Sequence, residues 1–357
     1  MAGCGVREGA TLCCRASTHP RVAGASKIGL AALCCLLGAA PVAAAEDAIT
    51  PSFAWPVRTE AKVSMTLHTT DQAFGSDRVR TYDLSATYDM CALKDPADHV
   101  RVRFANRGFV LPAGDVKETF DVYNCIPVLP VAFAPTLVVD RDATFLRVED
   151  GDDLRAALTA LVEDRVKDMP GGAADEGLIQ KQVRQGGSDA ALAREASDWW
   201  NSSVGLWNGR ALRRGEPVRW TAVQPLSVAG GTTIEVARQF RFEFVGRARC
   251  AENETDERCV ELTVTSEVAA EDFKRAADRL HDLLGGDMRV ELPENGNDAR
   301  LVTDPATLLP YRVHRSRRYS MIVKYGEQQV MGGRRHDEID MAFAYPAAPT
   351  GACDKGQ

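Results

Sequence analysis

Five basic residues crowd one short stretch near the end of an otherwise acidic chain: Arg312, His314, Arg315, Arg317 and Arg318. If this stretch is a β-strand, alternation places Arg315 and Arg317 on the side of Val313, the apparent core side. Because an unpaired buried charge is costly, two inward arginines need carboxylate partners or a polar cavity. One interpretation is a lining that recognises an anion, such as a lipid head group or an acidic peptide. The alternative is cross-strand pairing with the acids of residues 337–340.

Most of the tryptophans lie close together in the sequence. Four of the five fall within 22 residues: Trp199, Trp200, Trp207 and Trp220. Adjacent Trp199 and Trp200 cannot both enter one core from a helix, so we expect at least one to face a groove or a partner. Aromatic side chains at the edge of a cavity suit amphipathic ligands. We therefore predict that Trp199, Trp200 and Trp207 bind ligand together with Arg315 and Arg317, the alternative being ordinary packing of a helix end on a sheet.

Motifs of known enzyme chemistry are missing from the sequence. It contains no GxSxG elbow, P-loop, GxGxxG, HExxH or CxxC motif. Glu195 and Asp198 could serve a glycan-acting hydrolase, but their spacing does not fix a carboxylate pair. The best metal-like cluster, residues 336–340, lacks a second histidine at a useful spacing. We therefore predict neither a metal nor a cofactor and favour a protein that is not an enzyme.

An apolar run at residues 28–40 indicates export. Lys27 precedes the run, Pro41 ends it, and small residues lead to Ala45. These are the features of a secretory signal peptide cut after Ala45. The alternative is a membrane anchor, because the run approaches the ~20 residues that span a bilayer. Pro41 and the alanine-rich end favour cleavage over a membrane anchor. The segment before the apolar run is longer than is usual for a signal peptide, which suggests that the start codon has been assigned too early.

Removal of residues 1–45 changes both the charge and the cysteine content. The net charge falls from −7 to about −10, which disfavours nucleic acids and anionic membrane surfaces as partners. We expect a periplasmic or extracellular protein that is not an integral membrane protein after cleavage.

The five cysteines that remain are Cys91, Cys125, Cys250, Cys259 and Cys353. Cys250 and Cys259 flank a wholly polar connection between two strand-like runs, so a hairpin brings their sulfurs together and predicts a disulfide. By elimination, Cys91 and Cys125 form the next pair, since each lies at a strand end. Cys353 is then left over in a mobile tail.

Alternating apolar and polar residues predict long strands with one face on a core and one in water, and hence an antiparallel sheet. Clear strands cover residues 57–67, 82–90, 100–104, 234–244, 260–264 and 339–345; further strands are expected at 136–140, 145–148 and 311–325. In the strand predicted at residues 234–244, Arg238 is the only charged residue among the positions expected to face the core. Helical spacing marks residues 152–166, 178–183, 188–200 and 267–284.

This order of elements favours an α+β fold, with a large antiparallel sheet and helices packed on one face. We expect residues 46–345 to form one domain, or two diverged β-rich halves at 57–200 and 205–345. Residues 346–357 are expected to form a flexible tail.

The turn DPATLLP at residues 304–310, followed by the long cationic strand 311–325, resembles the sheets of exported bacterial lipoprotein-carrier proteins of half-barrel type. The segment GEPVRW at 215–220 is similar to a motif of uncharacterised bacterial secreted β-rich proteins. The resemblance covers scattered turns. It implies a curved, half-barrel-like sheet with helices over its concave face, an apolar ligand or partner between them, and no catalytic residues.

The sequence thus predicts an exported binding protein for a hydrophobic or amphipathic ligand, such as a lipid, or for an envelope protein. A glycan-acting hydrolase is the alternative from another class. A structural or assembly module that binds protein through its sheet edges is the third.

Overall fold

The computed structural model describes residues 48–77, 79–110, 134–167, 187–227, 233–284, 288–348, 350–351 and 353–354. The predicted leader, Cys125 and the expected helix at 178–183 lie outside these residues. The described strands are β1 (Ala48–Ile49), β2 (Arg58–Ala73), β3 (Val79–Lys94), β4 (Val100–Val110), β5 (Leu137–Val139), β6 (Phe145–Val148), β7 (Leu212–Arg213), β8 (Val218–Ser227), β9 (Thr233–Ala248), β10 (Cys259–Val268), β11 (Met288–Thr303), β12 (Pro310–Tyr325) and β13 (Gln328–Ala344). The described helices are α4 (Gly151–Lys167), α6 (Asp189–Trp200), the π-helical turn η2 (Asn201–Gly205) and α7 (Ala270–Leu284).

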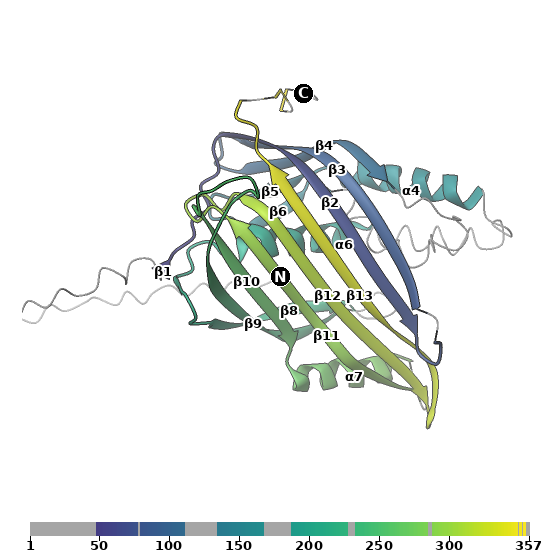
Figure 1. Cartoon of the computed structure of the whole chain (residues 1–357). Helices are drawn as coiled ribbons and strands as arrows, with labels where there is room; N and C mark the ends of the chain where they lie inside the picture. Colours follow the sequence, from purple (N-terminus) through teal and green to yellow (C-terminus); the bar gives the residue numbers. More distant parts are fainter. Residues whose placement is uncertain are drawn as a thin grey trace, which may run out of the picture. The chain divides into compact units, whose positions relative to one another are not determined.

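One large antiparallel sheet dominates the fold. Among the described strands, eleven join it in the order β6-β5-β4-β3-β2-β13-β12-β11-β10-β9-β8, while β1 and β7 pair separately. The first long strand of the chain, β2, lies beside the last, β13 (Figure 1). The sheet is curved and not closed, so the predicted α+β class with a half-barrel-like sheet is confirmed.

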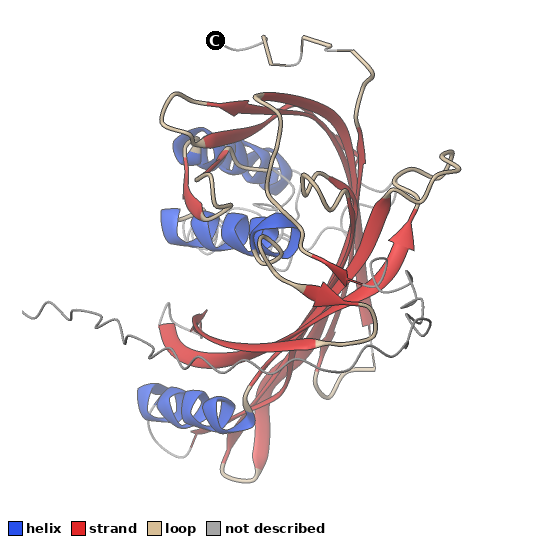
Figure 2. Ribbon diagram, turned by 90° about the vertical axis from the view of Figure 1, so that its left-hand side faces the viewer, coloured by secondary structure: helices blue, strands red, loops and turns tan. Residues whose placement is uncertain are grey.

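Strict alternation explains why the long strands form and which way they face. In β2, Ala61, Val63, Met65 and Leu67 are buried, and the residues between them are exposed. Such a strand places one face on the core and the other in water. Figure 2 shows two helices, α4 and α6, within the curve of the sheet and α7 apart from them at its lower end. Buried residues of α6 join the core cluster that contains these apolar side chains.

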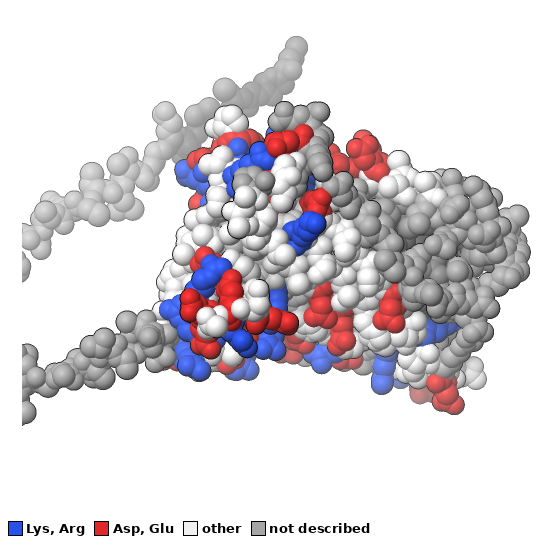
Figure 3. Space-filling model, turned by 45° about the horizontal axis from the view of Figure 1, so that its top comes forward, with Lys and Arg blue, Asp and Glu red and all other residues white. Residues whose placement is uncertain are grey.

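The outer surface mixes charges of both signs. On the face seen in Figure 3, Lys and Arg are interspersed with Asp and Glu and form no single-sign field. Ion pairs also join neighbouring strands of the sheet: Arg300 pairs with Glu261 at 2.7 Å and Arg318 with Asp298 at 2.6 Å.

Two disulfides occur among the described residues, and one corrects the sequence prediction. Cys250 and Cys259 are joined across the hairpin as predicted. Cys91 is joined to Cys353, so the predicted disulfide between Cys91 and Cys125 is wrong. The physical reason is that the tail turns back over β2, where Glu60 accepts hydrogen bonds from the backbone of Thr350 and Cys353. The tail therefore holds Cys353 opposite β3. Disulfides of this kind are typical of an oxidising, exported environment.

Candidate functional site

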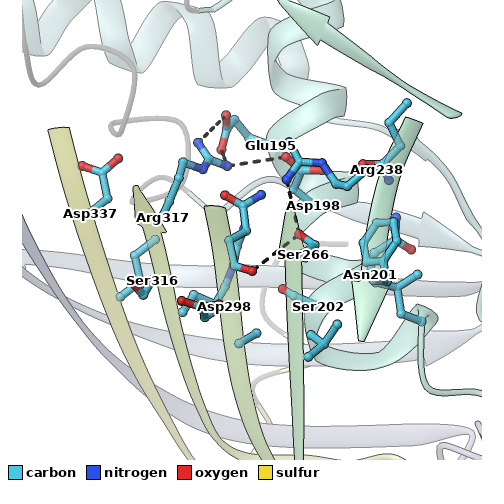
Figure 4. Close-up of a pocket in the computed structure, with 18 residues that line it drawn as sticks. Glu195, Asp198, Asn201, Ser202, Arg238, Ser266, Asp298, Ser316, Arg317 and Asp337 are labelled. Carbon is cyan, nitrogen blue, oxygen red and sulfur yellow. Dashed lines mark hydrogen bonds and ion pairs between the residues drawn. The ribbon is translucent and has the colours of Figure 1, made fainter. Parts of the chain in front are cut away.

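A small cavity lies between the C-terminal part of α6, the turn η2 and the concave face of strands β8 to β13. Its volume is about 70 Å³, enough for roughly five water molecules. Figure 4 shows polar side chains entering it from the helix and from several strands. The charged side chains that line it are Glu195, Asp198, Arg238, Asp298, Arg315, Arg317 and Asp337. Phe240, Val264 and Ile339 add apolar wall. The cavity thus combines a charged interior with apolar sides.

Helix α6 positions the two carboxylates of the cavity. Ser188 caps its first turn by accepting a hydrogen bond from the N–H of Ala191 at 3.3 Å. Spacing of three residues places Glu195 and Asp198 on one face of the helix. This face is turned toward the strands that carry the arginines (Figure 4).

The turn η2 continues α6 and adds Asn201 and Ser202 to the cavity wall. Its last residue must be small. A Cβ on Gly205 would lie 2.6 Å from Asn201 Oδ1 and 3.1 Å from the carbonyl oxygen of Ala143. Wide helical turns of this type are rare and recur at functional sites, and here the turn aims two polar side chains at the charged cavity.

The tryptophans predicted to bind ligand lie in the core. Trp200 and Trp207 are fully buried and Trp199 is 7% exposed. Trp199 packs against Phe104 of the sheet with ring centroids 5.5 Å apart, and Trp200 packs against Trp55 at the same separation. The expectation that adjacent Trp199 and Trp200 cannot both enter one core was wrong, because Phe53 and Trp55 of the segment before β2 pack against Trp200 and extend the core around α6. Of the residues that line the charged cavity in the described chain, none is one of these three tryptophans.

Arg317 occupies the centre of the cavity wall and binds both helix carboxylates. Its guanidinium lies 3.4 Å from Glu195 Oε1 and 3.5 Å from Asp198 Oδ2. Burial raises the pKa of the Glu195 carboxyl, but the charges of Arg317 and Arg315 outweigh it and leave the pKa lowered. Burial raises the pKa of Asp198, and its neighbour Glu195 adds to the rise against the opposing effect of Arg317. Attraction to Glu195 raises the pKa of Arg317 further.

The acids of residues 337–340 play a different part from the one expected. Asp337 is opposite Arg317 in the sheet register, yet its carboxylate accepts hydrogen bonds from Thr69 at 2.8 Å and Arg335 at 2.9 Å. Arg317 takes its ion pairs from α6. The predicted cross-strand ion pairs of the two arginines with residues 337–340 are therefore wrong within the described chain.

Unlike Arg317, neither Arg315 nor Arg238 forms an ion pair with a carboxylate of the residues that the structure describes. Within the described residues, Nη1 of Arg315 is fully buried without a hydrogen-bond partner. Arg238 is 8% exposed and donates to neutral groups, Ser266 Oγ at 3.3 Å and Asn295 Oδ1 at 3.1 Å. Burial lowers the pKa of both arginines, which still remain charged. The sequence pattern missed Arg238 as a site residue, although its interruption of an apolar parity was the available signal.

The metal-like cluster at residues 336–340 does not converge on one point. Asp340 pairs with His314 at 2.8 Å, and Glu338 lies 3.6 Å from His336. Among the described residues no group of three or more His, Cys, Asp or Glu could hold a metal ion. None of the described helices is long and apolar enough to cross a membrane.

Comparison with known proteins returns a loose likeness of architecture. No protein-family model matches the sequence, and no curated protein matches it. Among solved structures, lipovitellin, in a structure of its lipid–protein interactions, is 8% identical with a TM-score of 0.34 over 83% of this chain. This chain spans 26% of the lipovitellin chain.

Two further structures are more distant. OpdL of Pseudomonas aeruginosa is 6% identical with a TM-score of 0.16, covering 81% of this chain and 99% of its own. A DUF1329 family protein from Desulfovibrio piger is 9% identical with a TM-score of 0.13, covering 82% of this chain and 89% of its own. All three neighbours are β-rich, and none carries an argument about function. The resemblance to lipoprotein carriers and the envelope-protein partner stay predictions.

Proposed function

We propose that this chain is an exported binding protein that holds an amphipathic molecule, with the polar end of that molecule in the charged cavity. One observation carries the proposal: the cavity sets buried charges beside the apolar walls of Phe240, Val264 and Ile339. A few polar groups within a largely apolar lining is the usual make-up of a small-molecule site. At about 70 Å³ the cavity accommodates a head group rather than a whole lipid, so the apolar part of the ligand extends beyond it.

The state of the acids supports binding rather than catalysis. Glu195 and Asp198 both lie within 3.5 Å of the Arg317 guanidinium. A carboxylate engaged in this way is a weak base, because removing it from the arginine costs the ion pair. The disulfides fit an oxidising compartment outside the cytosol, where a carrier of this kind would work.

Native mass spectrometry of the protein purified from its own envelope tests the proposal. We expect a fraction of the molecules to carry an added mass that dissociates on activation and is identified as an amphipathic molecule. Ala299→Phe, which fills the cavity wall, should abolish the added mass. Ala342→Phe places the same side chain on the exposed outer face of β13 and should retain it. Bare protein in every preparation, together with no binding of added decanoate or 1-decanol, would contradict the proposal.

Hydrolysis of a glycan by Glu195 and Asp198 is the second candidate. Their pKa values move in opposite directions, which is how a carboxylate pair divides into base and acid. The engagement of both groups by Arg317 places this candidate second. If it holds, the purified protein releases reducing ends from peptidoglycan and Glu195→Gln abolishes the release, whereas a binding protein releases none.

A further inference from the structure

The charged groups of the cavity do not balance. Arg317 is matched by two carboxylates of α6, Asp337 is matched by Arg335, and Asp298 is matched by Arg318. Arg238 and Arg315 have no carboxylate within ion-pair distance in the part of the chain that the structure describes. On the outer face, by contrast, Arg300 and Arg318 each pair with an acid of a neighbouring strand. Arg238 and Arg315 thus lie unmatched in the cavity lining, where desolvation makes an unmatched charge costly.

The two unmatched arginines line one cavity, and neutral hydrogen-bond acceptors surround one of them, Arg238. Arg238 comes from β9 and Arg315 from β12, and both line the same cavity. Ser266 Oγ lies 3.3 Å from Arg238 Nη1. With its side-chain amide oriented to satisfy both its groups, Asn297 accepts a hydrogen bond from Arg238 at 3.2 Å. These neutral neighbours hold the guanidinium in place and leave its charge uncompensated.

The remaining acid strengthens the positive excess. The pKa of Asp198 is raised, which moves this acid toward its neutral form. Any protonation of Asp198 leaves Arg317 matched by Glu195 alone. With Arg238, Arg315 and Arg317 facing Glu195 and Asp198, the cavity carries at least one positive charge that no described side chain compensates. One negative charge on a ligand would restore the balance.

We infer that the polar end of the ligand is an acidic group with a single negative charge, bound between Arg315 and Arg238. A guanidinium binds carboxylate and phosphodiester oxygens through two parallel hydrogen bonds. The free Nη1 of Arg315 supplies a donor for one oxygen of the group. This inference rests on the proposed function, since it names the chemical class of the molecule that the same cavity holds.

Isothermal titration with three probes separates the possible ligands. Decanoate carries both the chain and the charge, 1-decanol carries the chain alone, and acetate carries the charge alone. We expect wild-type protein to bind decanoate more tightly than 1-decanol and acetate weakly. Binding of decanoate should weaken as salt increases, because the group is held by charge.

Arginine variants test the assignment. Arg315→Gln and Arg238→Gln should each weaken decanoate binding about 30-fold or more, as expected for the loss of one partner of a buried charge pair. Binding of 1-decanol should not change. Arg318→Gln is the matched control, since it removes the same charge from the outer face of the same strand as Arg315. Arg315→Lys keeps the charge and should retain most of the preference for decanoate, which separates loss of charge from misfolding.

Each contrary result has its own meaning. Equal affinity for decanoate and 1-decanol, unchanged in Arg315→Gln, overturns the inference and leaves the proposed function standing. Acetate binding as tightly as decanoate also overturns it, because the site would then take a free small anion. Failure of all three probes to bind rejects the proposed function and, with it, the inference.

Discussion

At the scale of single residues, the Glu60 carboxylate is held by several hydrogen bonds. It is buried on β2 and accepts from the N–H and hydroxyl of Thr350 at 2.6 and 2.7 Å. Arg58 donates to the other oxygen at 2.6 Å. Burial alone would raise the pKa of Glu60, but the hydrogen bonds from Thr350 and Arg58 outweigh it and hold the pKa at about 2. The ionised form is therefore what holds the tail against the sheet.

A dependence of stability on acid pH follows. Because the pKa of Glu60 is lower in the folded chain than its ordinary value of 4.5, its contribution is complete above about pH 4.5 and is lost as the pH falls toward 2. Glu60→Gln should lower the free energy of unfolding at pH 7 by about 2 kcal/mol, with the difference from wild type shrinking as the pH drops. Urea unfolding at pH 7, 4.5 and 3 measures this. A difference that stays constant over that range would show that ionised Glu60 does not hold the tail.

At the scale of elements, the strands that alternate cleanly were predictable, whereas β11, one of the strands that line the cavity, was not. The patterns of β2, β3 and β9 reflect a plain contrast between core and water. Strand β11 was not predicted, because it carries Asn295, Gly296 and Asn297 at its centre, a composition typical of turns. The structure pairs this stretch with β10 and β12 and turns Asn295 toward Arg238. Secondary-structure prediction from local sequence failed at β11, where the side chains contact the residues of the cavity.

The other wrong predictions share a cause. Burial of Trp199 and Trp200 together depends on the curvature of the sheet and on the segment that covers α6. The helical periodicity of the sequence gives no information about either. The partner of Cys91 lies 262 residues away, and its position depends on hydrogen bonds between the tail and Glu60. The sequence correctly placed Arg315 and Arg317 on the inner face of the sheet. It could not show that the partners of Arg317 come from α6, because that depends on how the helix packs on the sheet.

The turn η2 gives the prediction that belongs to an element. A Cβ at Gly205 would meet Asn201 Oδ1 at 2.6 Å and the backbone oxygen of Ala143 at 3.1 Å, so Gly205→Ala should destabilise the protein by about 1–3 kcal/mol. Gly296→Ala is the matched control, because its Cβ would meet only the Arg318 guanidinium at 3.6 Å, and we expect it to be neutral or slightly stabilising. Urea unfolding compares the two. Equal stability of both variants would mean that η2 adapts without cost.

At the scale of the whole described sheet, the two ends of the chain meet at one seam. Strand β2 pairs with β13 along twelve residues of each strand, with Met65 opposite Met341 and Leu67 opposite Ile339. The disulfide from Cys91 to Cys353 lies next to this seam and ties the tail to β3. The seam joins residues far apart in the sequence, so its formation closes a long loop and carries a large entropic cost. A covalent link between distant residues offsets that cost in the unfolded chain.

The long-range disulfide should therefore matter more than the hairpin disulfide. The residues that it joins are 262 apart, against 9 for Cys250 and Cys259. In the chain-entropy treatment, that difference in loop length corresponds to about 3 kcal/mol of additional stabilisation. We expect the pair of substitutions Cys91→Ser and Cys353→Ser to lower the free energy of unfolding by more than Cys250→Ser with Cys259→Ser, as measured by urea unfolding under non-reducing conditions. Because the same tail carries Thr350, adding Glu60→Gln to the Cys91/Cys353 variant should cost less than it costs the wild type. An equal loss in the two disulfide variants would show that the seam is held by its strand pairing and core contacts, with no help from the link between the chain ends.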